Sequence, residues 1–171
     1  MAARAAKQNT VVYYTHAPSP WGAMLLLSDG EALTHLQLPD SRHPLHVQPH
    51  WRQREDLPLF KTACRELAAY FAGRLRHFTI PLSLAGTGFQ ARVWRELARV
   101  PYGHAIAYSA LAEKIGAPAA VRAVAMANAR NPLPIIIPCH RIIGKNGALT
   151  GYSGGGVTRK AALLRLEGVA V

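Results

Sequence analysis

The stretch that most constrains the fold is the apolar segment 131–144, which surrounds the second of only two cysteines in the chain. Three successive isoleucines at 135–137 predict a segment that is buried on both sides. Prolines at positions 132, 134 and 138 restrict the backbone around them. The chain must therefore build a core around a rigid segment that holds the Cys139 thiol in a fixed and largely dry place.

Cys139 is followed by His140 and Arg141, which makes this segment a candidate reactive site. Burial in apolar surroundings raises the pKa of a thiol and makes it unreactive, whereas a neighbouring base or cation reverses that effect. Consecutive side chains of an extended chain point to opposite faces, so contact between Cys139 and His140 requires a turn here or a bridging water. These residues alone leave two interpretations open, a reactive thiol and a thiol that only packs in the core.

The other cysteine, Cys64, falls in a helix predicted over residues 57–73, on one face with Phe60, Leu67 and Phe71. A cysteine on such a face is expected to be inert packing. Two cysteines cannot make a disulfide framework or a four-cysteine metal site, and the eight histidines show no ligand spacing with either. We expect no metal and no cofactor.

Charge points to the class of partner. The 171 residues include 20 Lys and Arg against 9 Asp and Glu, a net charge of +11, and the sequence pI is about 10.4. The basic residues are interleaved with apolar ones, which indicates a folded basic surface. Nucleic acid is the favoured partner, with an anionic membrane or a generic basic protein as alternatives.

Targeting signals are not visible. The first ten residues lack the apolar segment of a signal peptide, and no apolar run approaches the roughly 18 residues of a membrane span. A free thiol survives in a reducing compartment, so we expect a cytoplasmic protein.

The first half of the chain predicts strands at 11–16, 23–27 and 33–38, with a turn at Pro18, Pro20 and Gly22 and a hairpin turn at Asp29-Gly30. Residues 39–56 are expected to form a loop, and 75–86 an extended connector after the helix 57–73. We place a boundary at about residue 85, between an α/β subdomain at 1–85 and a helical one at 86–171.

The second half predicts a helix-turn-helix. Thr87 to Gln90 match a capping box that opens a helix ending before Pro101. Ser109 is expected to cap a short helix at 110–115, and Pro118 to start another at 118–129. Alanines surround Arg122 in the latter, which suits either close packing or a smooth helix that enters a groove with one projecting cation.

The C-terminal part adds a possible ligand pocket. The glycine-rich segment 151–156 places the ring of Tyr152 and the hydroxyl of Ser153 beside exposed backbone, as a pocket for a flat ligand would. A last helix is predicted over 158–167. Glu167 stands at its C-terminal end, where the helix dipole disfavours a carboxylate, so it is either an exposed residue or one that orients a histidine or a water.

These residues together resemble the methylated-DNA–protein-cysteine methyltransferases, also called alkylguanine-DNA alkyltransferases. The resemblance is strongest at Pro138-Cys139-His140-Arg141, which matches the family's active-site signature, and it extends over roughly residues 87–168. The other matching segments are Phe89, Val93-Trp94, Pro101-Tyr102-Gly103, Tyr108, Arg122-Ala123-Val124, Asn131-Pro132, Gly151-Tyr152-Ser153-Gly154-Gly155 and Leu163–Glu167-Gly168.

The resemblance implies an α+β fold in which a small ribonuclease-H-like α/β subdomain packs on a winged-helix-like, helix-turn-helix subdomain. It also implies direct-reversal repair of double-stranded DNA by a monomer. The helix of Arg122, with Ala123 and Ala127, would lie in the minor groove. Arg122 would replace a flipped O6-alkylguanine in the base stack, and Tyr108 would help to rotate the base and donate to its ring nitrogen.

The same resemblance implies the remaining site residues. The base pocket and its hinge would include Asn131, Tyr152, Ser153 and Ile142. A relay from Cys139 through a water to His140 and Glu167 would deprotonate the thiol. The thioether product has no route back, so the protein would be a suicide enzyme consumed after one transfer. The metal-binding N-terminal cysteine cluster of some family members is not expected here, because two cysteines cannot supply it.

Two other functions compete with this one. A DNA-binding regulator or damage-recognition module would use the same helix-turn-helix without chemistry. A cysteine hydrolase would use Cys139 and His140, although no second general base or remote His-Asn pair stands out.

Overall fold

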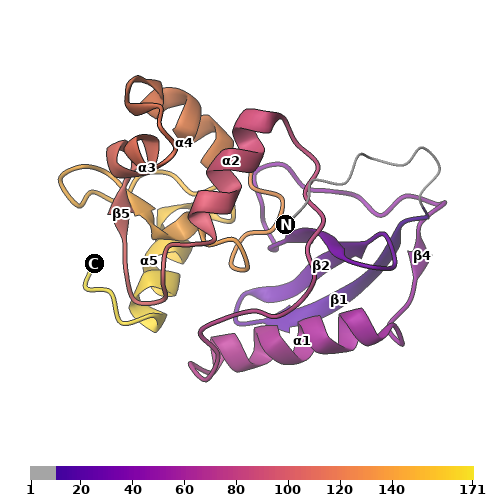
Figure 1. Ribbon diagram of the computed structural model, residues 1–171. Helices are drawn as coiled ribbons and strands as arrows, with labels where there is room; N and C mark the ends of the chain where they lie inside the picture. The colour runs from indigo at the N-terminus through magenta and orange to yellow at the C-terminus, as the bar shows by residue number, and fades with distance from the viewer. Residues whose placement is uncertain (1–10) are drawn as a thin grey trace. The chain divides into compact units, whose positions relative to one another are not determined.

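The apolar segments of the first half of the chain form a four-stranded sheet with one helix along it (Figure 1). The computed structural model describes residues 11–171, and by its internal contacts the chain divides into two units, 1–85 and 86–171. The sheet belongs to the first unit and has the order β3-β2-β1-β4, with β1 and β4 parallel and the other pairs antiparallel. The strands are β1 (Tyr13–Ser19), β2 (Gly22–Ser28), β3 (Leu33–Gln37) and β4 (Arg52–Gln53).

The turn between β2 and β3 is built by a side chain, as the Asp29-Gly30 pair predicts. The Asp29 carboxylate accepts the backbone N–H groups of Glu31 at 3.0 Å and Ala32 at 2.9 Å. The turn predicted from Pro18, Pro20 and Gly22 is present at Pro20 and Trp21, between β1 and β2, but Pro18 itself pairs with Ala23 inside β1. Its side of β1 faces β4, which reaches only the start of the strand, so the missing N–H of proline breaks no ladder bond.

Helix α1 (Pro58–Phe71) starts with a proline in its first turn and buries Phe60, Ala63, Glu66, Leu67 and Tyr70. Cys64 is only partly buried and lies at the edge of this face, so the prediction that it belongs to the buried face is wrong. The buried face of the helix also contains a polar contact that hydrophobic periodicity cannot show. Buried Glu66 accepts hydrogen bonds from the backbone N–H and the hydroxyl of Thr79.

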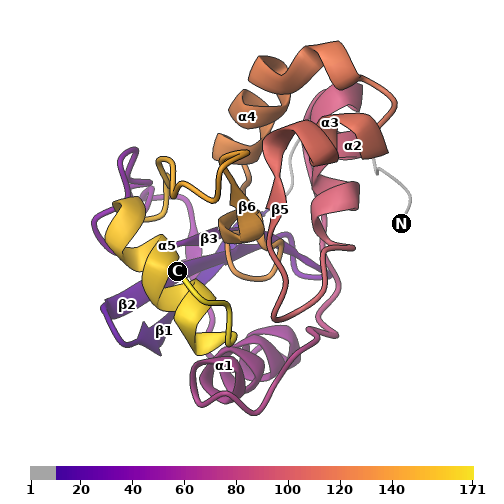
Figure 2. The same cartoon turned by 90° about the vertical axis from the view of Figure 1, so that its left-hand side faces the viewer.

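The second unit contains the predicted helix-turn-helix (Figure 2). Thr87 and Gln90 form both hydrogen bonds of the capping box. Ser109 is not a cap, because the chain passes from β5 directly into α3 and the helix begins at Tyr108. The elements are α2 (Gly88–Leu97), β5 (Ile106–Ala107), α3 (Tyr108–Lys114), the 3-10 turns η1 (Pro118–Ala120) and η2 (Cys139–Arg141), α4 (Val121–Ala129), β6 (Ile142–Ile143) and α5 (Gly156–Leu166).

Two contacts fix α4 and the segment after Cys139. The indole N–H of Trp94 on α2 donates to the carbonyl of Ala127 on α4 at 2.8 Å. Strand β6 pairs in parallel with β5, with Ile142 opposite Ile106. Within residues 11–171, no helix combines the length and the apolar character that crossing a bilayer would require.

Candidate active site around Cys139

The segment that carries Cys139 is buried as predicted, but it is a series of turns rather than an extended strand. Ile135, Ile136 and Ile137 are 1%, 8% and 1% exposed. Ile135 has φ = +75°, a left-handed conformation that is strained for a β-branched residue. The Asn131 side chain holds these turns by donating to the Ile137 carbonyl at 2.7 Å and accepting the Leu133 N–H at 3.0 Å.

The turn η2 changes the direction of the chain between Cys139 and Arg141 and places His140 and Arg141 on the same carboxylate. His140 Nε2 lies 2.9 Å from Glu167 Oε1. Arg141 donates from Nε at 2.7 Å and from Nη2 at 2.9 Å to the two Glu167 oxygens, and from Nη1 to the Val100 carbonyl. Glu167 is 4% exposed. This burial excludes the first of its two interpretations, an exposed carboxylate at the end of α5, and leaves the second, a residue that orients a histidine.

The charges of this cluster are set by the contacts. Burial alone would raise the pKa of Glu167, but the hydrogen bonds and charges of His140 and Arg141 lower it to about 2. Burial lowers the pKa of His140, against the opposing effect of Glu167. Glu167 is therefore ionised and His140 is neutral at neutral pH. Because a carboxylate only accepts, Nε2 carries the imidazole proton and Nδ1 is the basic nitrogen.

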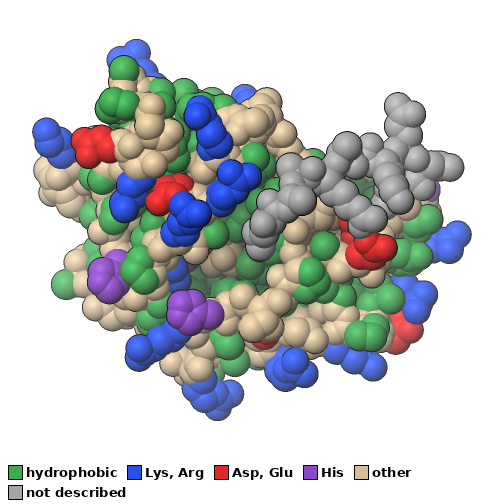
Figure 3. All heavy atoms as spheres, in the orientation of Figure 1, with side chains coloured by type: hydrophobic (Ala, Val, Ile, Leu, Met, Phe, Trp, Pro, Cys, Tyr) green, Lys and Arg blue, Asp and Glu red, His purple; other side chains and the backbone are tan. Residues whose placement is uncertain are grey.

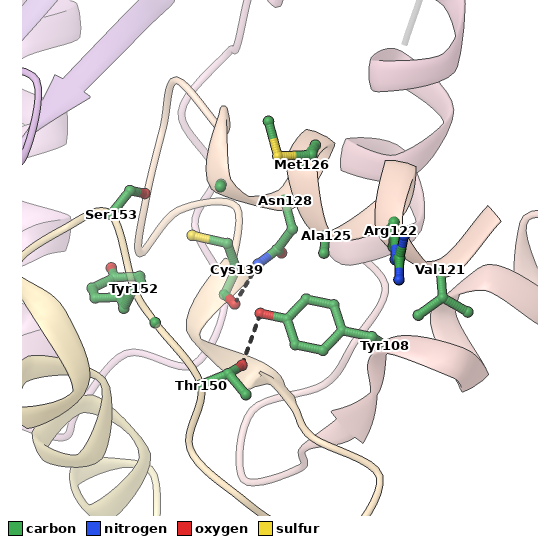
Figure 4. Close-up of a pocket in the computed structure, with 12 residues that line it drawn as sticks. Tyr108, Val121, Arg122, Ala125, Met126, Asn128, Cys139, Thr150, Tyr152 and Ser153 are labelled. Atoms are coloured by element: carbon green, nitrogen blue, oxygen red, sulfur yellow. Dashed lines mark hydrogen bonds between the residues drawn. The ribbon is translucent and has the colours of Figure 1, made fainter.

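Cys139 opens into a pocket of about 640 Å³ within the second unit (Figure 4). The thiol points toward the Tyr152–Ser153 loop, and the Tyr108 hydroxyl accepts a hydrogen bond from Thr150 at 3.3 Å. Residues 122, 125, 126 and 129 of α4 line the pocket along one helical face. The full lining comprises Tyr108, Val121, Arg122, Ala125, Met126, Asn128, Ala129, Cys139, Thr150, Gly151, Tyr152 and Ser153.

Burial raises the pKa of the Cys139 thiol to about 11, although hydrogen bonding from Asn131, the charge of Lys160 and hydrogen bonding from Tyr152 act in the opposite direction. The Lys160 side chain is itself buried, donates from Nζ to the Thr150 carbonyl at 3.2 Å, and has its pKa lowered to about 8 by burial. The thiol is thus protonated at neutral pH, and it needs a base to become a thiolate.

Five of the eleven site residues predicted from the sequence line the pocket, and the other six lie outside its lining. Tyr108, Arg122, Cys139, Tyr152 and Ser153 all line it. Ala123 is exposed on α4 outside the lining, and Asn131 supports the segment that leads to Cys139.

Ala127 and Ile142 also lie outside the pocket lining. Ala127 is 3% exposed and lies on the packed face of α4, where its carbonyl accepts a hydrogen bond from Trp94. Ile142 is fully buried in the β5–β6 pair rather than in the pocket.

Sequence reasoning missed four side chains of the site. Arg141 fixes Glu167, the charge of Lys160 lowers the pKa of the thiol, Thr150 contacts Tyr108, and the Asn128 amide donates to the Cys139 carbonyl at 3.4 Å. Only Arg141 carried a usable signal, since a buried arginine after Cys-His requires a carboxylate partner. Among residues 11–171, no group of His, Cys, Asp or Glu side chains is arranged to hold a metal ion.

The site combines a thiol with a histidine–carboxylate pair, and the pocket of the thiol is lined by α4, the second helix of a helix-turn-helix. These features define a cysteine-dependent group-transfer protein with a DNA-binding type of fold. The family comparisons agree with this class. Residues 88–169 match the DNA binding domain of 6-O-methylguanine DNA methyltransferase, and residues 12–84 match its ribonuclease-like domain. The chain belongs to the 6-O-methylguanine DNA methyltransferase family.

Individual relatives cover almost the whole chain. The methylated-DNA–protein-cysteine methyltransferase of Mycobacterium bovis is 46% identical over 157 residues, which are 92% of this chain and 93% of the relative. The constitutive enzyme of Bacillus subtilis is 42% identical over 91% of this chain and 94% of its own length. The crystal structure of Mycobacterium tuberculosis OGT in complex with DNA superimposes with a TM-score of 0.82 at 46% identity, covering 91% of this chain and 92% of that one.

These comparisons confirm three predictions from the sequence. They confirm the family resemblance, the α+β fold with a ribonuclease-like part before a DNA-binding part, and the activity class of a methylated-DNA–protein-cysteine methyltransferase that repairs DNA by direct reversal.

Proposed function

We propose that this protein binds duplex DNA that contains O6-alkylguanine and transfers the alkyl group to the sulfur of Cys139. A carbon–sulfur bond forms while the bond between the alkyl carbon and O6 breaks, and guanine leaves after gaining a proton. The thioether is stable, so each chain acts once. The acting form in this proposal is the monomer. The observation that carries this proposal is the Cys139 thiol, which faces a pocket of about 640 Å³ with His140 and Glu167 behind it.

The thiol is activated through His140. Its Nδ1 is buried and has no hydrogen-bond partner among residues 11–171. A water bound between Nδ1 and the sulfur would carry the Cys139 proton to it. Glu167 fixes the tautomer through Nε2 and stabilises the imidazolium that forms when the proton arrives. The positive charge of Lys160 favours the thiolate over the thiol.

DNA meets the exposed face of α4. Arg122 and Ala123 are exposed there, and alanine side chains let the helix approach the floor of a minor groove. Arg122 lines the pocket that receives the base, so its side chain fills the gap that the flipped nucleotide leaves. Figure 3 shows Lys and Arg side chains spread over the surface with few acidic ones among them, and the net charge of +11 gives phosphate contacts that weaken as salt increases.

Mass spectrometry tests the transfer. The protein is mixed with a duplex that carries one O6-methylguanine, and its intact mass and peptides are measured. We expect one added methyl group on Cys139 that never exceeds one per chain. Tight DNA binding with an unmodified Cys139 would instead identify a damage-recognition module, and many products per chain would identify a hydrolase.

The role of Arg122 has its own test, with Arg130, the exposed C-cap residue of α4, as the matched control. Replacing Arg122 by Ala removes the residue that offsets the cost of flipping, a few kcal/mol, so transfer from duplex DNA slows by roughly 100-fold. Transfer from free O6-benzylguanine, which needs no flipping, stays close to the wild-type rate. Arg130→Ala changes both rates little. Equal slowing of the two substrates by Arg122→Ala contradicts the role.

A further inference from the structure

One polar atom at the pocket has no role in the reaction described so far, the side-chain oxygen of Asn128. Asn128 lies on α4, is 5% exposed and belongs to the pocket lining. Its Nδ2 donates to the Cys139 carbonyl at 3.4 Å, whereas its Oδ1 is buried and has no hydrogen-bond partner within residues 11–171. Because the carbonyl can only accept, the amide nitrogen must face it, and the oxygen is the atom left over.

A second buried asparagine, Asn131, differs from Asn128 because both ends of its amide are hydrogen-bonded. Asn131 uses both ends of its amide, with Nδ2 on the Ile137 carbonyl and Oδ1 on the Leu133 N–H, and it holds the backbone. A buried carbonyl oxygen without a donor costs stability that a donor recovers. The single 3.4 Å bond of Asn128 is long and weak, so its amide can turn toward an incoming donor at little cost.

The Tyr108 hydroxyl lies near the Asn128 amide, and it can donate a hydrogen bond where Asn128 can accept one. In Figure 4 the Asn128 amide points to the space between the Cys139 carbonyl and the Tyr108 hydroxyl. The Tyr108 oxygen accepts from Thr150 and keeps its own proton to donate. The end of the pocket near Cys139 therefore offers a hydroxyl donor beside an amide acceptor.

We propose that Asn128 Oδ1 accepts a hydrogen bond from the 2-amino group of the flipped guanine, beside the Tyr108 hydroxyl that donates to the adjacent ring nitrogen. This inference rests on the proposed function. Guanine presents an acceptor next to an amino donor on that edge, whereas adenine and thymine present acceptors only. Asn128 is thus a specificity-determining residue that favours O6-alkylguanine over O4-alkylthymine.

Deleting one group on each partner tests the contact. Single-turnover transfer to Cys139 is measured from duplexes with O6-methylguanine or O6-methylhypoxanthine, which lacks only the 2-amino group. The wild-type protein should prefer guanine by roughly tenfold, the value of one hydrogen bond to a buried group. Asn128→Leu should bring the ratio close to one, because the guanine substrate slows about tenfold more than the hypoxanthine substrate, and any slowing caused by the lost bond to the Cys139 carbonyl affects both substrates and cancels in the ratio. Residual transfer from the hypoxanthine substrate shows that the variant is folded.

Asn128→Asp is the matched control, since it keeps an acceptor of the same shape and should keep the preference for guanine. A wild-type ratio of one, or a wild-type ratio that survives in Asn128→Leu, overturns the contact while transfer to Cys139 still supports the proposed function. If Asn128→Leu does not fold, the ratios of the wild type and Asn128→Asp decide. Absence of transfer from both substrates in the wild type would reject the proposed function itself.

Discussion

The two cysteines of this chain lie in regions that treat a thiol differently. Cys64 is partly buried on α1, where burial and the negative charge of Glu55 both raise its pKa. Cys139 is 1% exposed, and burial raises its pKa to about 11, but Asn131, Lys160 and Tyr152 oppose that rise. Neither thiol is ionised at neutral pH. The difference in function therefore comes from the pocket and the nearby base, not from the resting charge of the sulfur.

The largest expected effect separates the two thiols directly. Cys139→Ser should abolish methyl transfer from O6-methylguanine duplexes, because a serine hydroxyl is a far weaker nucleophile than a thiolate. Cys64→Ser should transfer one methyl group at the wild-type rate. Intact-mass measurement of both variants checks this. Loss of transfer in Cys64→Ser would show that the α1 region takes part in the reaction.

The buried acids of the same two regions should differ next. Glu167→Gln leaves the buried Arg141 guanidinium without its carboxylate and should lower the free energy of unfolding by about 3–5 kcal/mol. Glu66→Gln removes one hydrogen bond to Thr79 and should cost about 1–2 kcal/mol. Urea unfolding at pH 7 measures both. Equal losses would mean that the cluster behind Cys139 is no more strongly coupled than α1.

Acid should reduce the contribution of Glu167. Its pKa is lowered to about 2 in the folded protein from an ordinary value of 4.5, so the unfolded chain binds more protons between these values. The stability that Glu167 supplies is complete above pH 4.5 and is lost as the pH falls toward 2. The difference in melting temperature between the wild type and Glu167→Gln should shrink across this range. A constant difference down to pH 2 would contradict the lowered pKa.

The smallest expected effect concerns the rate at which iodoacetamide alkylates each thiol. This reagent carries no nucleobase that the pocket could bind. At neutral pH in the absence of DNA, iodoacetamide should label Cys64 several times faster than Cys139, because Cys139 is almost inaccessible and its thiol is protonated. Peptide mass spectrometry gives the two rates. In urea the two rates should become equal, and faster labelling of folded Cys139 would mean that the site already holds a thiolate.

The sequence predicted those parts of the fold that depend on local side-chain chemistry. The Thr87 capping box and the Asp29 turn are confirmed, because each is completed within four residues. The isoleucine segment was predicted to be buried, and its burial is confirmed, but its turns were not predicted. Its turns depend on the amide of Asn131 and on the left-handed Ile135, which hydrophobic pattern does not encode.

The candidate site shows the same limit. Family resemblance placed His140 and Glu167 in one relay, and they lie 2.9 Å apart, while their roles remain proposals. Ala127 was expected to be on the outer face of its helix, but η1 occupies the first turn and α4 begins only at Val121. Arg141 and Asn128 were missed because their partners are distant in sequence or belong to the backbone.

The contacts of Arg141 have a consequence for the order in which the site is assembled. Arg141 binds Val100, 41 positions earlier, and Glu167, 26 positions later, whereas Asn131 and Ile137 are only six residues apart. Local turns close quickly, and long loops close slowly. A chain that emerges from the ribosome therefore forms the turns around Cys139 before Glu167, the carboxylate partner of His140 and Arg141, has been synthesised. The thiol gains its complete relay only when residue 167 has been synthesised and α5 has docked.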